Sequence, residues 1–206
     1  MSEEETPGGS PGEALERHPS PGEALERHPS LDDRFDPAVR LVEYDAAWPA
    51  QADEELRRLK EALGPVAVRL EHVGSTAVPG LAAKPILDLQ ISVAAIEPRA
   101  HYVEPLERLG YLFVPAPESP DFHFFAKPPQ RPRTHHLHIC EVRSEHEFRH
   151  VAVRDFLRAH GDEAAAYAAL KRQVVARHPQ DRLAYIEGKQ DYVAGLQARA
   201  VERARG

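Results

Sequence analysis

The spacing of apolar residues becomes regular at about residue 39 and stays so almost to the C-terminus. Apolar residues that alternate with polar ones are typical of strands, and apolar residues three or four apart are typical of helices. Alternating or short continuous apolar runs predict strands at 39–45, 66–73, 85–93, 111–115, 121–127 and 134–142. The three-to-four spacing predicts helices at 48–64, 98–110, 148–160, 163–178 and 182–204.

Residues that begin or end helices support this order. Gly64 follows the first predicted helix, as glycine commonly does at a helix C-terminus. Ser144 begins a capping-box pattern, and Asp162 and Asp181 are suited to cap the last two helices. Because strands dominate up to the last strand and three helices follow, we predict an α+β fold. It consists of a small mixed β-sheet with flanking helices and a C-terminal helical layer.

Residues 1–38 differ from the rest of the chain. They contain the decapeptide PGEALERHPS twice in tandem, at 11–30, and are rich in Pro, Gly, Ser and Glu. Since so few apolar side chains cannot bury a core, we predict a disordered acidic tail followed by one domain at 39–206. The alternative is a short linear motif displayed twice and phosphorylated at Ser10 or Ser20.

The net charge of −7 belongs to the tail, where ten acidic residues face three arginines. Residues 39–206 carry equal numbers of acidic and basic side chains, so no broad basic field favours duplex nucleic acid. The acidic N-terminus and the lack of a membrane-length apolar run predict a soluble cytoplasmic protein without a membrane partner. Cys140 is the single cysteine, and we expect a buried, unreactive thiol rather than a functional one.

The stretch HVGSTAVPGLAAKPILDLQISV at 72–93 holds the main candidates for chemistry. Gly74 permits backbone conformations closed to other residues, and Ser75 can turn an N–H and a hydroxyl toward an anion. Asp88 lies in the next apolar run, where a lone buried carboxylate is unfavourable without a compensating partner. Asp88 and Gln90 share one face of that strand. Oxygen ligands beside a phosphate-holding turn are typical of metal-assisted phosphoryl transfer.

The segment LEHVGSTAVPGLAAKPILDLQISV, with VRDFLRAH, YAALK and YIEGK in the helical half, resembles the signature of the GrpB family. The resemblance extends from about Val39 to about Leu196. It implies a nucleotidyltransferase-like fold in which the glycine–serine turn and an Asp-x-Asp/Glu strand form the active centre. Such domains also resemble those fused to dephospho-coenzyme A kinase in some bacteria, which implies nucleotide-related work.

The chain departs from the pattern that this resemblance implies. Asp88 fits the first acidic position, but Gln90 stands at the second, where an amide is a weaker ligand for Mg²⁺. The neighbouring strand offers His136 and His138 on one face in place of a third acid, with His123 expected nearby. This set suits one softer ion, Mn²⁺, Zn²⁺ or Fe²⁺, bound by Asp88, Gln90, His136 and His138. The alternative is a polar strand face that binds no metal.

Basic residues recur at intervals of four around the predicted helix 148–160: His146, His150, Arg154 and Arg158. Residues four apart are neighbours on a helix, so the row that ends in two arginines is expected to bind a phosphate or carboxylate. The alternative is a solvated helix face. His72, beside the Gly–Ser turn, is expected either to touch the ligand or to hydrogen-bond a backbone carbonyl.

Three lysines complete the predicted ligand site. Lys84 precedes Asp88 in the loop and is expected to neutralise a phosphate or pair with that carboxylate. Lys171 and Lys189 each follow a tyrosine by four residues, which puts a phenol and an ammonium on one helical face. These pairs are expected to frame a nucleotide. The alternative is that they lie along the helix surface.

The function that these residues favour is transfer of a nucleotidyl or phosphoryl group to a small acceptor. Gly74 and Ser75 would hold the phosphates, Asp88 a divalent metal, and Lys84 and Arg154 the developing negative charge. Asp88, Ser75 and Lys84 are then the catalytic candidates.

Two other functions stay open. Because Gln90 replaces an acid, the same site is compatible with a module that binds a nucleotide or another small anion and does no chemistry. A one-metal hydrolase or lyase built on Asp88, His136 and His138 is the third interpretation.

Overall fold

The structure, a computed structural model, describes residues 38–115, 121–128 and 132–206, so the predicted tail lies outside it except for its last residue. The strands are β1 (Arg69–Val73), β2 (Leu87–Val93), β3 (Leu112–Val114), β4 (Phe122–Lys127) and β5 (His135–Glu141). The helices are α2 (Trp48–Leu63), α3 (Ala100–Arg108), α4 (Glu145–Ala159), α5 (Gly161–Arg177), α6 (Arg182–Glu187) and α7 (Gln190–Arg205). Across these described parts, no helix combines the length and the apolar character needed to cross a membrane.

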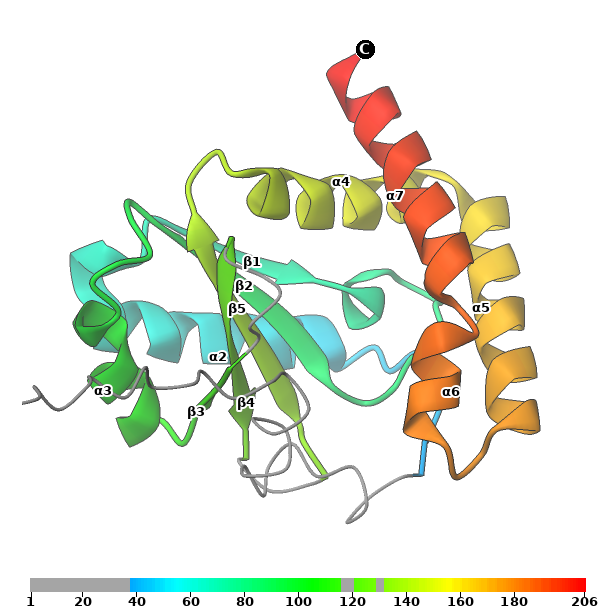
Figure 1. Cartoon of the computed structure of the whole chain (residues 1–206), viewed down its shortest axis with the longest axis horizontal. Coiled ribbons are helices and arrows are strands. Elements are labelled where there is room, and N and C mark those ends of the chain that lie inside the picture. Colours follow the sequence, from blue (N-terminus) through cyan, green and yellow to red (C-terminus); the bar gives the residue numbers. More distant parts are fainter. Residues whose placement is uncertain (1–37, 116–120, 129–131) are drawn as a thin grey trace, which may run out of the picture.

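The five strands form one mixed sheet in the order β1–β2–β5–β4–β3. Strands β2 and β5 run parallel, and the other neighbouring pairs are antiparallel. In Figure 1, α4 runs along the top of the sheet, and α5, α6 and α7 stand together at the right. The α+β fold predicted from the sequence is therefore confirmed.

The two faces of the sheet differ in chemistry because successive side chains of a strand alternate. One face packs in the apolar core with α2 and α3, where the inner strand residues are fully buried: Leu89, Ile91, Leu137 and Ile139. Burying a side chain of this size contributes about 1.5–3 kcal/mol. The opposite face carries polar residues paired across β2 and β5: Asp88 with His136, and Gln90 with His138. Helix α4 contacts β1 and β5, and this polar face is where the candidate site lies.

Local signals set several helix ends as predicted. Gly64 ends α2 with a φ of 53°, in the region that favours glycine. At α4, the Ser144 hydroxyl accepts a hydrogen bond of 3.2 Å from the backbone N–H of Glu147. At α6, the Asp181 carboxylate accepts one of 2.9 Å from the N–H of Ala184. Such a cap stabilises a helix by about 1 kcal/mol.

Two predictions near the ends of elements are wrong. Residues 39–45 do not form a strand. They make one isolated bridge, between Val42 and Ala83. Because Ala83 lies in the loop between β1 and β2, there is no neighbouring strand with which a longer ladder could form. Asp162 is not the cap of α5, since that helix begins one residue earlier, at Gly161, and the acid lies in its first turn.

The predicted last helix, 182–204, is in fact two helices, α6 and α7, separated at Gly188. A Cβ at Gly188 would lie 2.8 Å from a methyl group of Val174 on α5. The glycine therefore permits close packing of the end of α6 on α5, a contact that no local pattern encodes.

Cys140 is buried as the sequence predicts, whereas His123 does not lie where the sequence places it. Cys140 is fully buried beside Ser92, and burial raises the pKa of its thiol to about 11, as expected for an unreactive cysteine. His123 does not join the polar face, because its register partner on β5 points into the core, and its Nδ1 hydrogen-bonds the hydroxyl of Tyr102 instead.

Candidate functional site

A cavity of about 310 Å³ is lined by the turn after β1, by strands β2 and β5, and by helices α4 to α7. It gathers most of the residues singled out in the sequence: Gly74, Ser75, Lys84, Asp88, His136, His138, Lys171 and Lys189. Asp88 and the Gly74–Ser75 turn therefore open onto the same hollow.

Gly74 brings the turn and the carboxylate into direct contact. Its φ is 70° and its ψ is −169°, a combination essentially restricted to glycine. A Cβ at this position would lie 2.8 Å from the Cβ of Asp88, which is too close for two carbon atoms. Ser75 follows directly and begins a short 3₁₀ turn, Ser75–Ala77.

Asp88 is held as a carboxylate. Its side chain is 31% exposed, and one oxygen accepts a 3.0 Å hydrogen bond from Nδ1 of His136. Burial raises the pKa of Asp88, but the hydrogen bond and the nearby positive charges outweigh this effect and lower the pKa to about 2. Burial lowers the pKa of His136, so the pair consists of a carboxylate and a neutral imidazole at neutral pH.

Lys171 is the most deeply buried cation of the cavity, with 2% of its surface exposed. Its ammonium donates a 3.1 Å hydrogen bond to the Ser75 hydroxyl and another to the carbonyl of Ala82. It also lies 4.5 Å from the ring centroid of Tyr167. Burial lowers the pKa of Lys171 to about 7, so its proton is weakly held unless an anion arrives.

Two further lysines approach a second tyrosine. The ammonium groups of Lys189 and Lys84 lie 5.6 and 5.9 Å from the ring centroid of Tyr185, which is 2% exposed. Burial lowers the pKa of Lys189 as well. The rings of Tyr167 and Tyr185 thus contact lysine ammonium groups, and these contacts occupy the rings that the sequence suggested for stacking on a base.

The two arginines predicted to bind substrate do not line this cavity. Arg154 donates to the carboxylate of Glu71 and to the carbonyl of His72, with only 10% of its side chain exposed. Arg158 donates a 2.9 Å hydrogen bond to the carbonyl of Ala77 and lines a different cavity. Both side chains link α4 to β1 and to the turn after β1, because both project from the side of α4 that faces these segments.

His72 contacts the Gly–Ser turn from outside the cavity. It is 8% exposed, and burial lowers the pKa of its imidazole to about 4. Its Nε2 lies 3.0 Å from the hydroxyl of Thr76, which itself donates to the carbonyl of Ile86. His72 is thus a neutral donor that braces the Gly–Ser turn, and it is not among the residues that line the cavity.

Gln90 is completely buried and also lies outside the cavity lining. Its amide oxygen is 3.0 Å from Nδ1 of His150, and its amide nitrogen donates to the carbonyl of Glu147 at 3.4 Å. Its two polar ends are therefore engaged with α4 rather than turned toward an ion in the cavity.

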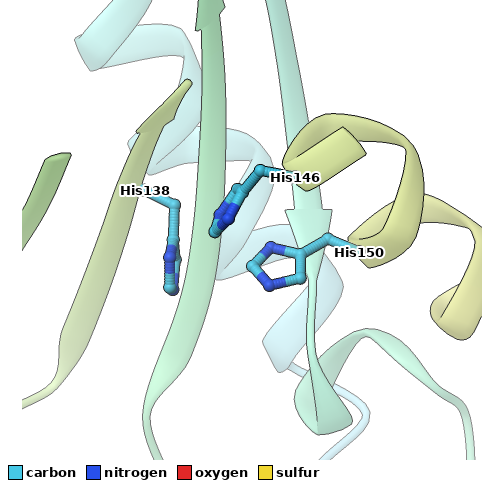
Figure 2. A group of neighbouring side chains, drawn as sticks. All are labelled: His138, His146 and His150. Atoms are coloured by element: carbon cyan, nitrogen blue, oxygen red, sulfur yellow. The ribbon is translucent and has the colours of Figure 1, made fainter. Parts of the chain in front are cut away.

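The polar face also assembles a histidine cluster that sequence reasoning did not identify. His138 on β5 and His146 and His150 on α4 place one nitrogen each within 4.8 Å of one another, and Figure 2 shows the three rings together between strand and helix. Burial lowers the pKa of all three, to about 3 for His146 and about 4 for His150, so each imidazole is neutral. The four-residue spacing of His146 and His150 is the sequence signal for this cluster, and the same spacing continues to Arg154 and Arg158, which predicts a basic row instead.

Mg²⁺, the usual ion of metal-assisted phosphoryl transfer, does not fit these residues. Among the described residues that line the cavity, Asp88 is the one carboxylate, and three lysines contribute positive charge beside it. Mg²⁺ prefers several oxygen ligands, and it gains nothing from ammonium neighbours. We therefore derive no step through Mg²⁺.

The comparisons with known proteins identify the family. The family model described as GrpB protein matches residues 38–199, and the chain belongs to the GrpB family. A solved structure described as conserved protein GrpB from Enterococcus faecalis superposes with a TM-score of 0.76 at 33% sequence identity, covering 81% of this chain and all of that one.

Some curated relatives carry a family name that states no activity, and others are named as a kinase. The chain is 38% identical to UPF0157 protein PA4798 of Pseudomonas aeruginosa over 173 residues, covering 82% of the chain and 71% of the relative. It is 36% identical to UPF0157 protein YqkA of Bacillus subtilis over 170 residues, covering 82% of this chain but about half (49%) of that protein. It is also 34% identical to a protein of Mycolicibacterium paratuberculosis named dephospho-CoA kinase, over 79% of this chain and 46% of the relative.

Proposed function

We propose that the cavity binds a small phosphate-bearing molecule of nucleotide type and transfers a phosphoryl or nucleotidyl group from it. The observation that carries this proposal is the ammonium of Lys171, which is buried and donates to the hydroxyl of Ser75 next to the glycine turn. Two of the three N–H groups of this ammonium are engaged, with Ser75 and Ala82, and a desolvated cation with a remaining donor beside a hydroxyl is a good phosphate partner.

Charge supports the same assignment. Lys84, Lys171 and Lys189 line a cavity in which Asp88 is the single carboxylate among the described lining residues, so the lining is positive overall. An incoming phosphate would compensate the positive charge of the ammonium groups. It would thereby raise the lysine pKa values that burial lowers. The molecule is taken to be nucleotide-like because one relative is named dephospho-CoA kinase, although the shared part is less than half of that protein.

The residues can act in transfer through position and charge. Phosphoryl transfer depends mostly on alignment and on neutralising charge that spreads over the phosphate oxygens. The lysines would supply the neutralising charge. The acceptor hydroxyl would attack the phosphorus while the P–O bond to the leaving group breaks, and the leaving phosphate or pyrophosphate group would depart beside the lysines. The Asp88 carboxylate, fixed by His136, would align the attacking hydroxyl through a hydrogen bond and take up its proton as the new bond forms.

Binding without transfer is the second candidate, and a specific observation favours it. Gln90 occupies the second acidic position of the implied pattern, and both ends of its amide are engaged with α4. The carboxylate pair that nucleotidyl transfer commonly uses is thus replaced by a single Asp88.

Calorimetric titration with pyrophosphate and with ATP tests binding. Lys189→Met should weaken both ligands at least about tenfold, since a hydrogen bond to a charged group contributes about 1.5–3 kcal/mol. Arg199→Met is the matched control, because Arg199 is an exposed cation of α7 that pairs with Glu163 outside the cavity. Equal weakening by both variants, or no binding to the wild type, would refute the proposal.

Phosphorus NMR of bound ATP separates the two candidates. Release of ADP or pyrophosphate that stops in Asp88→Asn supports transfer. Tight binding with ATP unchanged over many hours would leave the binding module as the function.

A further inference from the structure

We propose that His138, His146 and His150 bind one divalent transition-metal ion, with Zn²⁺ preferred. This metal site differs from the one expected from the sequence, which consists of Asp88, Gln90, His136 and His138. Only His138 belongs to both sites. The inference stands on the cluster itself and does not depend on anion binding in the cavity.

Unpartnered buried nitrogens are the first argument. Four histidine nitrogens of the described residues are buried without a hydrogen-bond partner: Nδ1 of His138, both ring nitrogens of His146 and, outside the cluster, Nε2 of His136. His146 is only 3% exposed. Buried polar atoms almost always have a partner, so each exception calls for one. A metal ion accepts one lone pair from each neutral imidazole, so it would satisfy one nitrogen of each ring.

The second argument is the partner of His150. The amide oxygen of Gln90 accepts the hydrogen on Nδ1 of His150 at 3.0 Å, which leaves Nε2 with a free lone pair. Histidine ligands commonly donate their other N–H to an oxygen in this way, which fixes the tautomer and the ring orientation. Gln90 therefore acts as a positioning residue.

The rings are held close to coordination distance. Their centroids lie 4.3 Å apart for His146 and His150 and 4.9 Å apart for His138 and His150. Ligand nitrogens at 2.0–2.1 Å around a tetrahedral Zn²⁺ lie about 3.4 Å from one another. Since the candidate atoms already lie within 4.8 Å, small rotations of the side chains are sufficient. Phe122 stacks on His146 with a centroid distance of 4.1 Å and limits its freedom.

The chemistry of the ligands selects the ion. Three neutral imidazoles suit Zn²⁺ and its neighbours, whereas Mg²⁺ prefers oxygen. Three protein ligands leave a fourth position open, as in catalytic zinc sites. His138 and His150 also line the cavity, so an ion bound here would face the space in which the anion is proposed to bind.

The experiment is zinc loading of the full chain, purified without a histidine tag, followed by dialysis and elemental analysis. The wild type should retain about one equivalent of Zn²⁺, and Mg²⁺ should not compete. Titration with Co²⁺ should give the visible absorption of a tetrahedral site. His146→Phe and His150→Gln should each lose the ion, because two ligands hold it too weakly.

His160→Phe is the matched control. His160 stacks on Phe156 at 4.1 Å, as His146 stacks on Phe122, but it lies at the other end of α4 and outside the cluster. This variant should retain the metal. Less than about one-tenth equivalent in the wild type would overturn the proposal, and so would full retention in His150→Gln. If His146→Phe fails to fold, His150→Gln carries the test.

Discussion

The amide oxygen of Gln90 accepts a hydrogen bond from Nδ1 of His150 at 3.0 Å, and this contact joins strand β2 to α4. The same side chain donates to the carbonyl of Glu147, one helical turn earlier. The position that would carry a second acid in a nucleotidyltransferase is thus used to orient a histidine.

Replacement of Gln90 by Leu should keep the packing volume but remove the hydrogen bond to His150. We expect zinc affinity to fall about 10- to 100-fold, as is usual when the outer partner of a histidine ligand is lost. Competition with a chelator measures this change. An unchanged zinc affinity with an intact melting curve would contradict the positioning role.

Replacement of Gln90 by Glu should not create Mg²⁺-dependent transfer. A carboxylate there would face the carbonyl of Glu147 in place of the donating amide, at a fully buried position. We expect a loss of about 2 kcal/mol or more in the free energy of unfolding, measured with urea. A gain of Mg²⁺-dependent ATP turnover in this variant would show that a second carboxylate completes a magnesium site here.

Gly74→Ala should destabilise the protein by about 3 kcal/mol, because it adds backbone strain and a clash with Asp88. Gly80→Ala is the control: its φ is also positive, at 77°, but nothing lies within 4 Å of the added methyl. We expect only about 1–2 kcal/mol there. Similar losses for both variants in urea unfolding would mean that the close approach to Asp88 is unimportant.

Anion affinity should fall as pH rises, because the pKa of Lys171 is lowered to about 7, by burial first and then by the charge of Lys189. Sulfate is a suitable probe because its own charge is constant over this range. Its affinity should drop at least about tenfold between about pH 6 and about pH 9, and Lys171→Met should remove most of this dependence.

The stability of the ligand-free protein should change in the opposite direction. The unfolded chain holds the Lys171 proton up to its ordinary pKa of 10.5, whereas the folded chain releases it near 7. The unfolded state therefore binds more protons between these values, and the free energy of unfolding should rise with pH there. Urea unfolding of the wild type and of Lys171→Met at several pH values measures this difference, and identical slopes would contradict it.

Arg154→Met should lower stability and leave anion binding unchanged. Arg154 holds Glu71 and the carbonyl of His72 and does not line the cavity, so about 1–3 kcal/mol of stability should be lost. Pyrophosphate titration of this variant checks the second half. A tenfold weaker affinity would restore Arg154 to the ligand site.

Much of the fold was predictable because its patterns are local. The helical spacing of α2 and the apolar run of β2 are contained within the elements themselves, and the structure confirms both. The break between α6 and α7 was missed, since it depends on the packing of Gly188 against Val174 of another helix.

The site was predictable where its residues are close in sequence. Gly74 and Asp88 belong to one turn and the strand that follows it, so their meeting could be inferred. The histidine cluster was not predictable in this way, because His138 meets His146 and His150 only after α4 packs on the sheet. The rotation of α4 about its own axis also decides that Arg154 points to β1 rather than into the cavity.

A crystal structure of the full chain grown with saturating pyrophosphate tests the central claim most directly. The account predicts phosphate density in the cavity, within hydrogen-bonding distance of the Ser75 hydroxyl and the ammonium groups of Lys171 and Lys189. Pyrophosphate bound only elsewhere on the protein, with this cavity filled by water alone, would contradict it.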